Sequence, residues 1–270
     1  MTTIGTLPPP NELERRSRVI AFLDTLIEPD RSLRYFDFDP KWAKGERLAS
    51  MRSGEGDHYF IWFGRAGALV RGKHGRTTAV TDDRLFAELP RALFPARREP
   101  AFQLGGDSLA AWWTTGADAW SFAIDPKRGG AGQLLIALDG AAKTFASYAR
   151  EYHELTLGAR ALVALFDGAP IRADLIASLS PALDANRAFA IAHKLGLATQ
   201  GKPPARGRKP APTIDDETVG DAEFKIIRLD DTTKLVVGGK VQLAAPSGAL
   251  YIKVLEQVRA TLRAGGASSR

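Results

Sequence analysis

The chain contains 270 residues, of which 44% are hydrophobic and 25% charged, with no cysteine and a formal net charge of +6. This length suffices for one sizeable core or for two domains, and the apolar content excludes wholesale disorder. The lack of cysteine excludes thiolate nucleophiles, iron–sulfur clusters, cysteine-ligated zinc and a disulfide framework. The N-terminus lacks the basic and apolar regions of a signal peptide, and no apolar run approaches the length of a membrane span. We therefore expect a soluble, cytoplasmic protein with no membrane partner.

The first elements in chain order are a short tail, a helix and a strand. Residues 1–10 end in three consecutive prolines and are predicted to be disordered. A helix is predicted over residues 11–27, where Asn11 and Glu14 have the spacing of a capping box. The aromatic residues of 33–38 predict a strand that ends at Asp39-Pro40.

Residues 46–72 carry the most informative local pattern. Apolar runs at 48–52, 58–63 and 68–71 are separated by short turns that contain glycine, which predicts an antiparallel meander. The run at 58–63 is apolar at both odd and even positions, so both of its faces are expected to be buried. We therefore expect it to form a central strand that is covered on both sides.

The remaining pattern separates strands from helices. A helical stretch is predicted over residues 82–93, with a break or kink at Pro90, and a second hairpin is predicted from strands at 109–115 and 119–124. Helices then follow at 134–138, 141–154, 159–167, 171–179 and 184–195. Because strands precede helices instead of alternating with them, the fold class is expected to be α+β, with a main domain over residues 11–198.

The end of the chain is predicted to form a separate small module. Residues 199–221 are rich in proline and basic residues and are predicted to be a linker. Residues 222–264 are predicted to form a ββα-like module, and residues 265–270 a disordered tail. Its strands are expected at 223–229 and 234–237, with a third at 241–243, before a helix that begins at Ser247 and runs to residue 263.

The positive charge is concentrated towards this end. Residues 199–270 contain 12 Lys and Arg against 8 Asp and Glu, which leaves the rest of the chain nearly balanced. Arg206-Gly207-Arg208, followed by Lys209, resembles the core of an AT-hook, whose extended arginines enter the minor groove of A·T-rich DNA. Lys209 stands where the hook has a proline, and a solvated basic linker is the alternative. Arg206, Arg208 and Lys209 are thus candidate nucleic-acid contacts.

No motif for catalysis or for metal binding is present. The four histidines show no metal-ligand spacing and there is no nucleophile elbow, so we predict no catalytic residue, no metal site and no cofactor. The candidate partner- or ligand-binding residues cluster around the first meander turn and its neighbouring strands. They are Glu55, Asp57, His58, His74 and Trp62. The alternatives are a hairpin turn for the glycine-rich segment, a surface or hydrogen-bonded structural role for the histidines, and a core position for the aromatic residues.

One segment resembles a known group of proteins. Ser50-Met51-Arg52-Ser53-Gly54-Glu55-Gly56-Asp57, followed by an aromatic strand and a glycine turn, resembles a pattern shared by uncharacterised bacterial proteins. The resemblance extends over about residues 11–197 and implies no activity, because none is assigned to the group. After Gly72 this chain has Lys73-His74-Gly75-Arg76, where the group carries a His-Glu pair. A function that rests on that pair is therefore not implied here.

Three hypotheses follow for the function. The leading one is a non-catalytic protein-interaction module, including an immunity-like role in bacteria, with a protein as the partner. The second is nucleic-acid association through the Arg206-Gly207-Arg208 linker. The third is an enzyme whose site is assembled in space from Asp57, His58 and His74.

Overall fold

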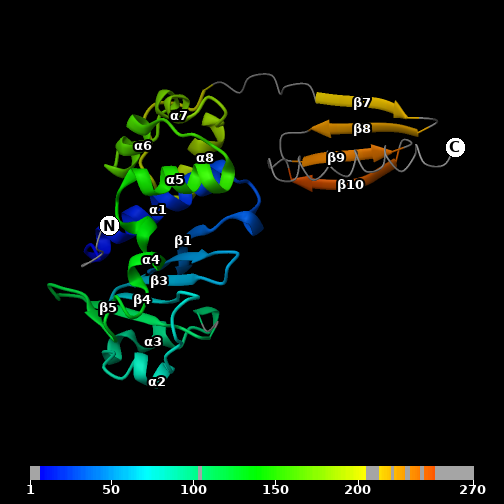
Figure 1. Ribbon diagram of the computed structural model, residues 1–270. Helices are drawn as coiled ribbons and strands as arrows, with labels where there is room; N and C mark the ends of the chain where they lie inside the picture. Colours follow the sequence, from blue (N-terminus) through cyan, green and yellow to red (C-terminus); the bar gives the residue numbers. More distant parts are fainter. Residues whose placement is uncertain are drawn as a thin grey trace. The chain divides into compact units, whose positions relative to one another are not determined.

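The computed structural model of the protein describes residues 7–102 and 105–204 with their side chains, followed by the backbone of four strands between residues 213 and 246 (Figure 1). The chain divides into two compact units. The first combines residues up to 27 with residues 34–203, and the second combines residues 28–33 with residues from 204 onward. The first unit contains all of the side-chain geometry discussed below.

The first unit begins with a long helix, α1 (Pro10–Ile27), as predicted. Its start differs from the predicted capping box: the Asn11 side chain accepts a hydrogen bond from Glu12 N, and Glu14 instead pairs with Arg18 and Arg47. Pro10 is the first residue of the helix. Proline favours this position because its φ is already helical and because an N–H there would have no partner within the helix. The 3₁₀ turn η1 (Arg31–Leu33) follows in the chain and belongs to the second unit.

A six-stranded antiparallel sheet forms the centre of this unit, and its strands follow one another in sequence order. The predicted meander is confirmed, because β2, β3 and β4 pair antiparallel in sequence order, with Ile61 opposite both Ala49 and Val70. The predicted second hairpin is present, with a shortened second strand. The bounds are β1 (Phe36–Ala43), β2 (Glu46–Arg52), β3 (His58–Gly64), β4 (Gly67–Lys73), β5 (Leu109–Thr114) and β6 (Ser121–Phe122).

Strand β1 does not end at Asp39-Pro40 as predicted. It continues to Ala43, and its register against β2 shifts between Asp39 and Ala43. The shift accommodates Pro40, because β1 is an edge strand and needs no ladder hydrogen bond on its open side. Proline was therefore a misleading stop signal at this edge position.

Strand β3 is buried on both faces, which confirms the expectation for residues 58–63. Tyr59, Ile61 and Phe63 belong to the larger core, which is shared with α1 and the helices that follow the sheet. Phe60 and Trp62 belong to a second, smaller core on the opposite face. The odd and even positions of one strand thus supply two separate hydrophobic cores.

Short helical segments cover the smaller core, and the helical stretch predicted over residues 82–93 is interrupted before Pro90, the residue that was expected to break or kink it. Pro90 separates the segments, as a proline inside a helical pattern does. Leu85, Phe86, Leu93 and Phe102 are the main side chains that they contribute. The segments are α2 (Asp82–Leu85), η2 (Arg91–Leu93), α3 (Phe94–Arg97) and η3 (Pro100–Phe102).

The helices after the sheet cover the larger core together with α1 (Figure 1). Their positions agree with the predicted ones to within a few residues, except that the stretch at 134–138 is divided in two. They are α4 (Ala131–Leu134), η4 (Ile136–Leu138), α5 (Ala142–His153), α6 (Ala159–Phe166), α7 (Ala173–Leu179) and α8 (Ala185–Leu195). The fold is therefore α+β, as predicted. Among the described residues, no helix is both long and apolar enough to cross a membrane.

The second unit contains a four-stranded antiparallel sheet in the order β10-β9-β8-β7. Its strands are β7 (Thr213–Val219), β8 (Ala222–Arg228), β9 (Thr232–Val237) and β10 (Lys240–Pro246). Strand β7 corrects the sequence prediction, which assigned residues 213–219 to the linker. The linker was predicted from the proline-rich, basic stretch at residues 202–212, which does not extend into β7, and the charged residues of β7 are of a kind common on edge strands. The predicted helix from Ser247 and the tail at 265–270 lie outside the described residues.

The prediction of a disordered tail over residues 1–10 is wrong for its last residues. Leu7 is 5% exposed, and the Pro8 carbonyl accepts a hydrogen bond from the Trp120 indole at 2.8 Å. Pro10 already belongs to α1. Residues 1–6 lie outside the described part of the chain.

Candidate functional site

Two of the candidate site residues contact each other. His74 follows β4, Asp57 precedes β3, and the His74 Nδ1 atom lies 3.0 Å from Asp57 Oδ2. The other oxygen, Asp57 Oδ1, accepts a hydrogen bond from Gly75 N at 2.6 Å. The antiparallel pairing of β3 and β4 brings these two ends together, because His58 lies opposite Lys73. The carboxylate therefore orients the imidazole and holds the following loop.

This pair supplies the carboxylate and the imidazole of an acid–base site. Among the described residues, no uncommitted hydroxyl nucleophile joins them. A carboxylate at Nδ1 favours the tautomer whose Nε2 can accept a proton. The nearby hydroxyl groups are occupied, since Ser108 Oγ donates to Gly129 O and Thr77 Oγ1 donates to His74 O. Within the described part of the chain, the geometry fits a loop-stabilising contact better than a catalytic triad.

His58 lies in a different environment from Asp57, its neighbour in sequence. It is 7% exposed and its Nε2 atom lies 3.4 Å from Asp107 Oδ1. Asp107 also pairs with the buried guanidinium of Arg71, which reaches Asp82 as well. The predicted His58 site is thus part of a buried ionic cluster beside the smaller core, and it is not an accessible binding surface.

The other predicted site residues do not gather around this pair. Glu55 is exposed at the turn, where Gly56 has a φ of 90° that favours glycine. Trp62 is 5% exposed in the smaller core, and its indole N–H donates to Glu46 at 2.9 Å. Trp62 is therefore a core residue, as the alternative interpretation proposed. Arg206, Arg208 and Lys209 lie outside the described residues.

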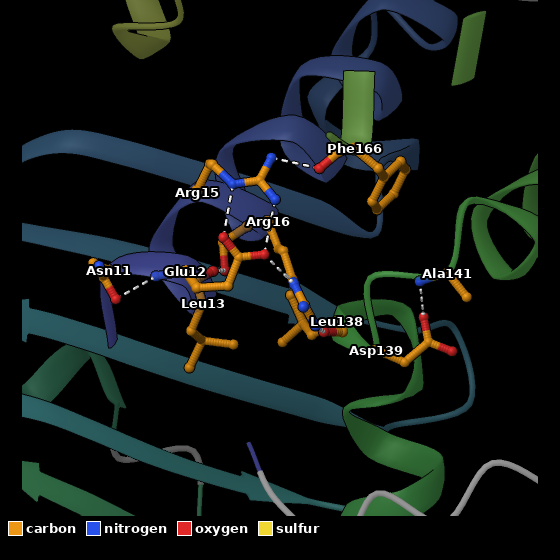
Figure 2. A network of polar contacts seen from close by, with 10 residues as sticks. Asn11, Glu12, Leu13, Arg15, Arg16, Leu138, Asp139, Ala141 and Phe166 are labelled. Carbon is orange, nitrogen blue, oxygen red and sulfur yellow. Dashed lines mark hydrogen bonds and ion pairs between the residues drawn. The ribbon is translucent and has the colours of Figure 1, made fainter. Parts of the chain in front are cut away.

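Three arginines of α1 each reach the end of another helical segment. Arg15, Arg16 and Arg18 donate to the carbonyls of Phe166, Leu138 and Leu195, at 2.5, 2.9 and 2.6 Å respectively. These carbonyls belong to the last residues of α6, η4 and α8. The final carbonyls of a helix lack partners within it, so a cation placed there both satisfies and stabilises them. Figure 2 shows two of the three contacts.

Two glutamates of the same helix hold these arginines in place. Glu12 contacts Arg15 and Arg16, each at 2.7 Å (Figure 2). Glu14 contacts Arg18 at 2.5 Å. The hydrogen bond from Arg15, followed by that from Arg16, lowers the pKa of Glu12 to about 2 against the opposing effect of burial. For Glu14, burial opposes the shift, but hydrogen bonds from Arg47 and Arg18 lower the pKa overall. The basic face of α1 is therefore neutralised within the fold and offers little to an anionic partner.

The lowered pKa of Glu12 predicts a specific pH dependence of stability. A carboxylate with a pKa of about 2 in the folded state and 4.5 as its ordinary value stabilises the fold above about pH 4.5 and loses this effect as the pH falls towards 2. Glu12→Gln should therefore lower the free energy of unfolding by about 1 kcal/mol at pH 7, and the difference should vanish near pH 2. Urea unfolding of the wild type and of Glu12→Gln at several pH values measures this difference in the free energy of unfolding. A difference that is constant with pH would contradict the assignment.

One hollow of the first unit lies beside the end of the sheet. It has a volume of about 730 Å³ and is lined by the rings of Trp113, Trp120 and Phe122, together with Leu7–Pro9. Trp113 lies two residues after Ala111 in β5, and residues two apart in a strand share one face of the sheet. Because Ala111 belongs to the larger core, Trp113 lies on the same face as α1. We call this hollow the tryptophan groove.

The two tryptophans form a continuous aromatic wall in this groove. Their ring centroids lie 5.8 Å apart with an interplanar angle of 68°, an edge-to-face arrangement. Both side chains are only partly buried. Partly exposed tryptophans that line a hollow are typical of binding surfaces, because a flat aromatic ring buries a large area at a low cost in conformational entropy.

A second hollow, of about 390 Å³, lies between α1 and the ends of α6 and α8. Arg15, Arg18 and Glu14 line it, and all three are already engaged in the contacts described above. Val19 and Phe22 form part of its apolar lining. This hollow offers fewer uncommitted polar groups than the tryptophan groove, which we take as the candidate functional site.

Sequence reasoning did not identify this site. The tryptophans were interpreted as core residues or as an interface, and the prolines as a flexible tail. The available signal was the presence of prolines at residues 8–10 together with the two tryptophans of the second hairpin, but their proximity depends on the tertiary fold. No protein-family model matches the sequence, and neither a curated protein nor a solved structure matches it, so the resemblance to the bacterial group stays a prediction and the site is assigned on geometry alone.

Proposed function

We propose that this protein is a non-catalytic interaction module that binds a protein partner through the tryptophan groove. The observation that supports this most directly is the groove itself, in which Trp113 and Trp120 remain partly exposed beside a hollow of about 730 Å³. Aromatic side chains of this kind contribute much of the affinity at protein interfaces.

The polar rim of the groove also suits a protein partner. Asp118 and Ala119 are exposed at its edge. The Asp139 carboxylate is occupied by Ala141 N and Thr144 Oγ1, whereas no ion pair with another described residue engages Asp118. An apolar wall beside an uncommitted carboxylate is the arrangement expected where a hydrophobic centre is surrounded by a polar rim.

Site-specific crosslinking in the native cells of the protein tests this proposal. A photoreactive residue at Ala119 should crosslink to one defined protein, and the product should disappear when Trp113 is replaced by alanine. The matched control places the same residue at Val163, which is 48% exposed on α6 and distant in sequence from the groove. Thermal unfolding of the Trp113→Ala protein checks that the fold is retained. Equal products from both positions, or none from Ala119, would overturn the proposal.

A further inference from the structure

The tryptophan groove already contacts a short proline-containing segment of the same chain. The Trp120 indole N–H donates to the Pro8 carbonyl at 2.8 Å, and Leu7 is 5% exposed beside it. Pro9 is exposed, and its carbonyl accepts from Leu13 N in the first turn of α1. Residues 7–9 therefore leave the helix start and extend along the aromatic wall.

This contact has the chemistry of proline-rich peptide recognition. Leu7, Pro8 and Pro9 each precede a proline, which restricts all three to extended conformations. In the polyproline II form a backbone has no internal hydrogen bonds, so its carbonyls are free to accept from a side-chain donor. Grooves lined with aromatic residues bind such segments by combining ring contacts with a few donor side chains. Trp113 and Trp120 supply the rings, and Trp120 also supplies the donor.

The groove is only partly filled by residues 7–9. The hollow of about 730 Å³ is the space that remains beside them, and Asp118 is exposed at its rim. Arg16 is the basic side chain among its lining residues, and it is occupied by Glu12 and the Leu138 carbonyl. The local charge available to a ligand is therefore negative, which favours a basic side chain on the partner.

We propose that the tryptophan groove binds a proline-rich segment of a partner protein that carries an arginine or lysine, and that Leu7 and Pro8 act as an intramolecular competitor for it. The inference rests on the proposed function and names its partner class. The partner's proline carbonyl takes the place of the Pro8 carbonyl at Trp120, and its basic residue pairs with Asp118. Release of residues 7 and 8 leaves α1 intact, because the first helical hydrogen bond uses the Pro9 carbonyl.

Fluorescence anisotropy with a labelled peptide of about ten residues, which is about 30 Å long in the polyproline II form, tests this directly. The probe is a proline-rich peptide with one arginine, and its two controls replace either the prolines by alanine or the arginine by glutamine. The Leu7→Ser/Pro8→Ala protein should bind the probe about tenfold more tightly than the wild type, because the competing segment is released. Neither protein should bind the alanine control.

Two conservative variants assign the contacts within the groove. Trp120→Phe keeps the ring but removes the N–H, and it should weaken binding of the probe about tenfold in the Leu7→Ser/Pro8→Ala background. Asp118→Asn should weaken binding of the arginine probe but leave binding of the glutamine control unchanged. Equal affinities across these variants would overturn the proposed orientation of the peptide.

The remaining outcomes distinguish this inference from the proposed function. If neither the wild type nor the Leu7→Ser/Pro8→Ala protein binds the probe while the crosslink at Ala119 persists, the proline-rich partner is wrong and the interaction module stands. If the crosslink at Ala119 is also absent, both the proline-rich partner and the proposed interaction module are wrong. Dimerisation in the absence of peptide that is abolished by Trp113→Ala would identify a second copy of this chain as the occupant and would overturn the inference.

Discussion

Replacement of Arg71 by methionine is expected to lower the free energy of unfolding by about 3–5 kcal/mol, because it leaves a buried carboxylate without its cation. Arg71 and Asp107 are each 2% exposed. Arg71 Nε donates to Asp107 Oδ2 at 2.6 Å, and the Arg71 guanidinium also lies over the Phe86 ring at 5.1 Å. Methionine retains much of the apolar packing, so the loss should come mainly from the uncompensated charge of Asp107.

A double variant separates this charge effect from a loss of packing. Arg71→Met/Asp107→Leu removes both charges and should recover a large part of the stability lost in the single variant, since apolar replacement of a whole buried pair is often close to neutral. Arg84→Met is the matched control on the exposed side of α2 and should change stability by less than about 0.5 kcal/mol. Urea unfolding measures all four proteins. A double variant as unstable as Arg71→Met would contradict the charge argument.

The parts of the fold that could be predicted from sequence are those set by local patterns. The first meander followed from apolar runs separated by short turns with glycine. The double burial of β3 followed from an uninterrupted apolar run, because a strand with one solvated face would alternate. The late helices ended near Gly140, Gly168 and Gly196, which adopt the left-handed conformation that commonly ends a helix.

The contacts that could not be predicted join residues far apart in the chain. Arg15, Arg16 and Arg18 belong to one helix, and each satisfies the end of a different helical segment. Asp57 and His58 were adjacent candidates, but alternation along the strand sends them to separate partners, His74 and Asp107. Such pairings depend on tertiary packing, and no local periodicity encodes them.

Turn and linker signals also misled where tertiary context overrode them. Prolines suggested a disordered N-terminal tail, but an aromatic wall binds residues 7 and 8. Pro40 suggested the end of a strand, but an edge strand accommodates it with a shift of register. In both places proline removes an N–H donor without a cost, because the sheet or helix does not need that donor. In this chain a proline therefore indicates either the end of an element or a segment that packs against another part of the fold.

Asp24 is expected to be among the most sensitive positions of the protein, because a fully buried carboxylate joins α1, β1 and α5. Its side chain accepts from the backbone N–H groups of Tyr35 and Phe36, each at 2.9 Å, and from Tyr148 Oη at 3.0 Å. His153 Nε2 lies 3.3 Å away. Burial, followed by the Asp24 charge, raises the pKa of Tyr148, so this phenol stays protonated and remains a donor at neutral pH.

Asp24→Ala should therefore lower the free energy of unfolding by about 3 kcal/mol, because it leaves the buried Phe36 N–H, the partly buried Tyr35 N–H and the Tyr148 hydroxyl without their acceptor. Asp24→Asn keeps one acceptor oxygen for these groups and should cost less, about 1–2 kcal/mol. Glu88→Ala, an exposed change on the opposite side of the sheet, is the control and should be nearly neutral. Urea unfolding at pH 7 gives the three values. Equal losses for alanine and asparagine would show that the negative charge, and not the acceptor geometry, stabilises this junction.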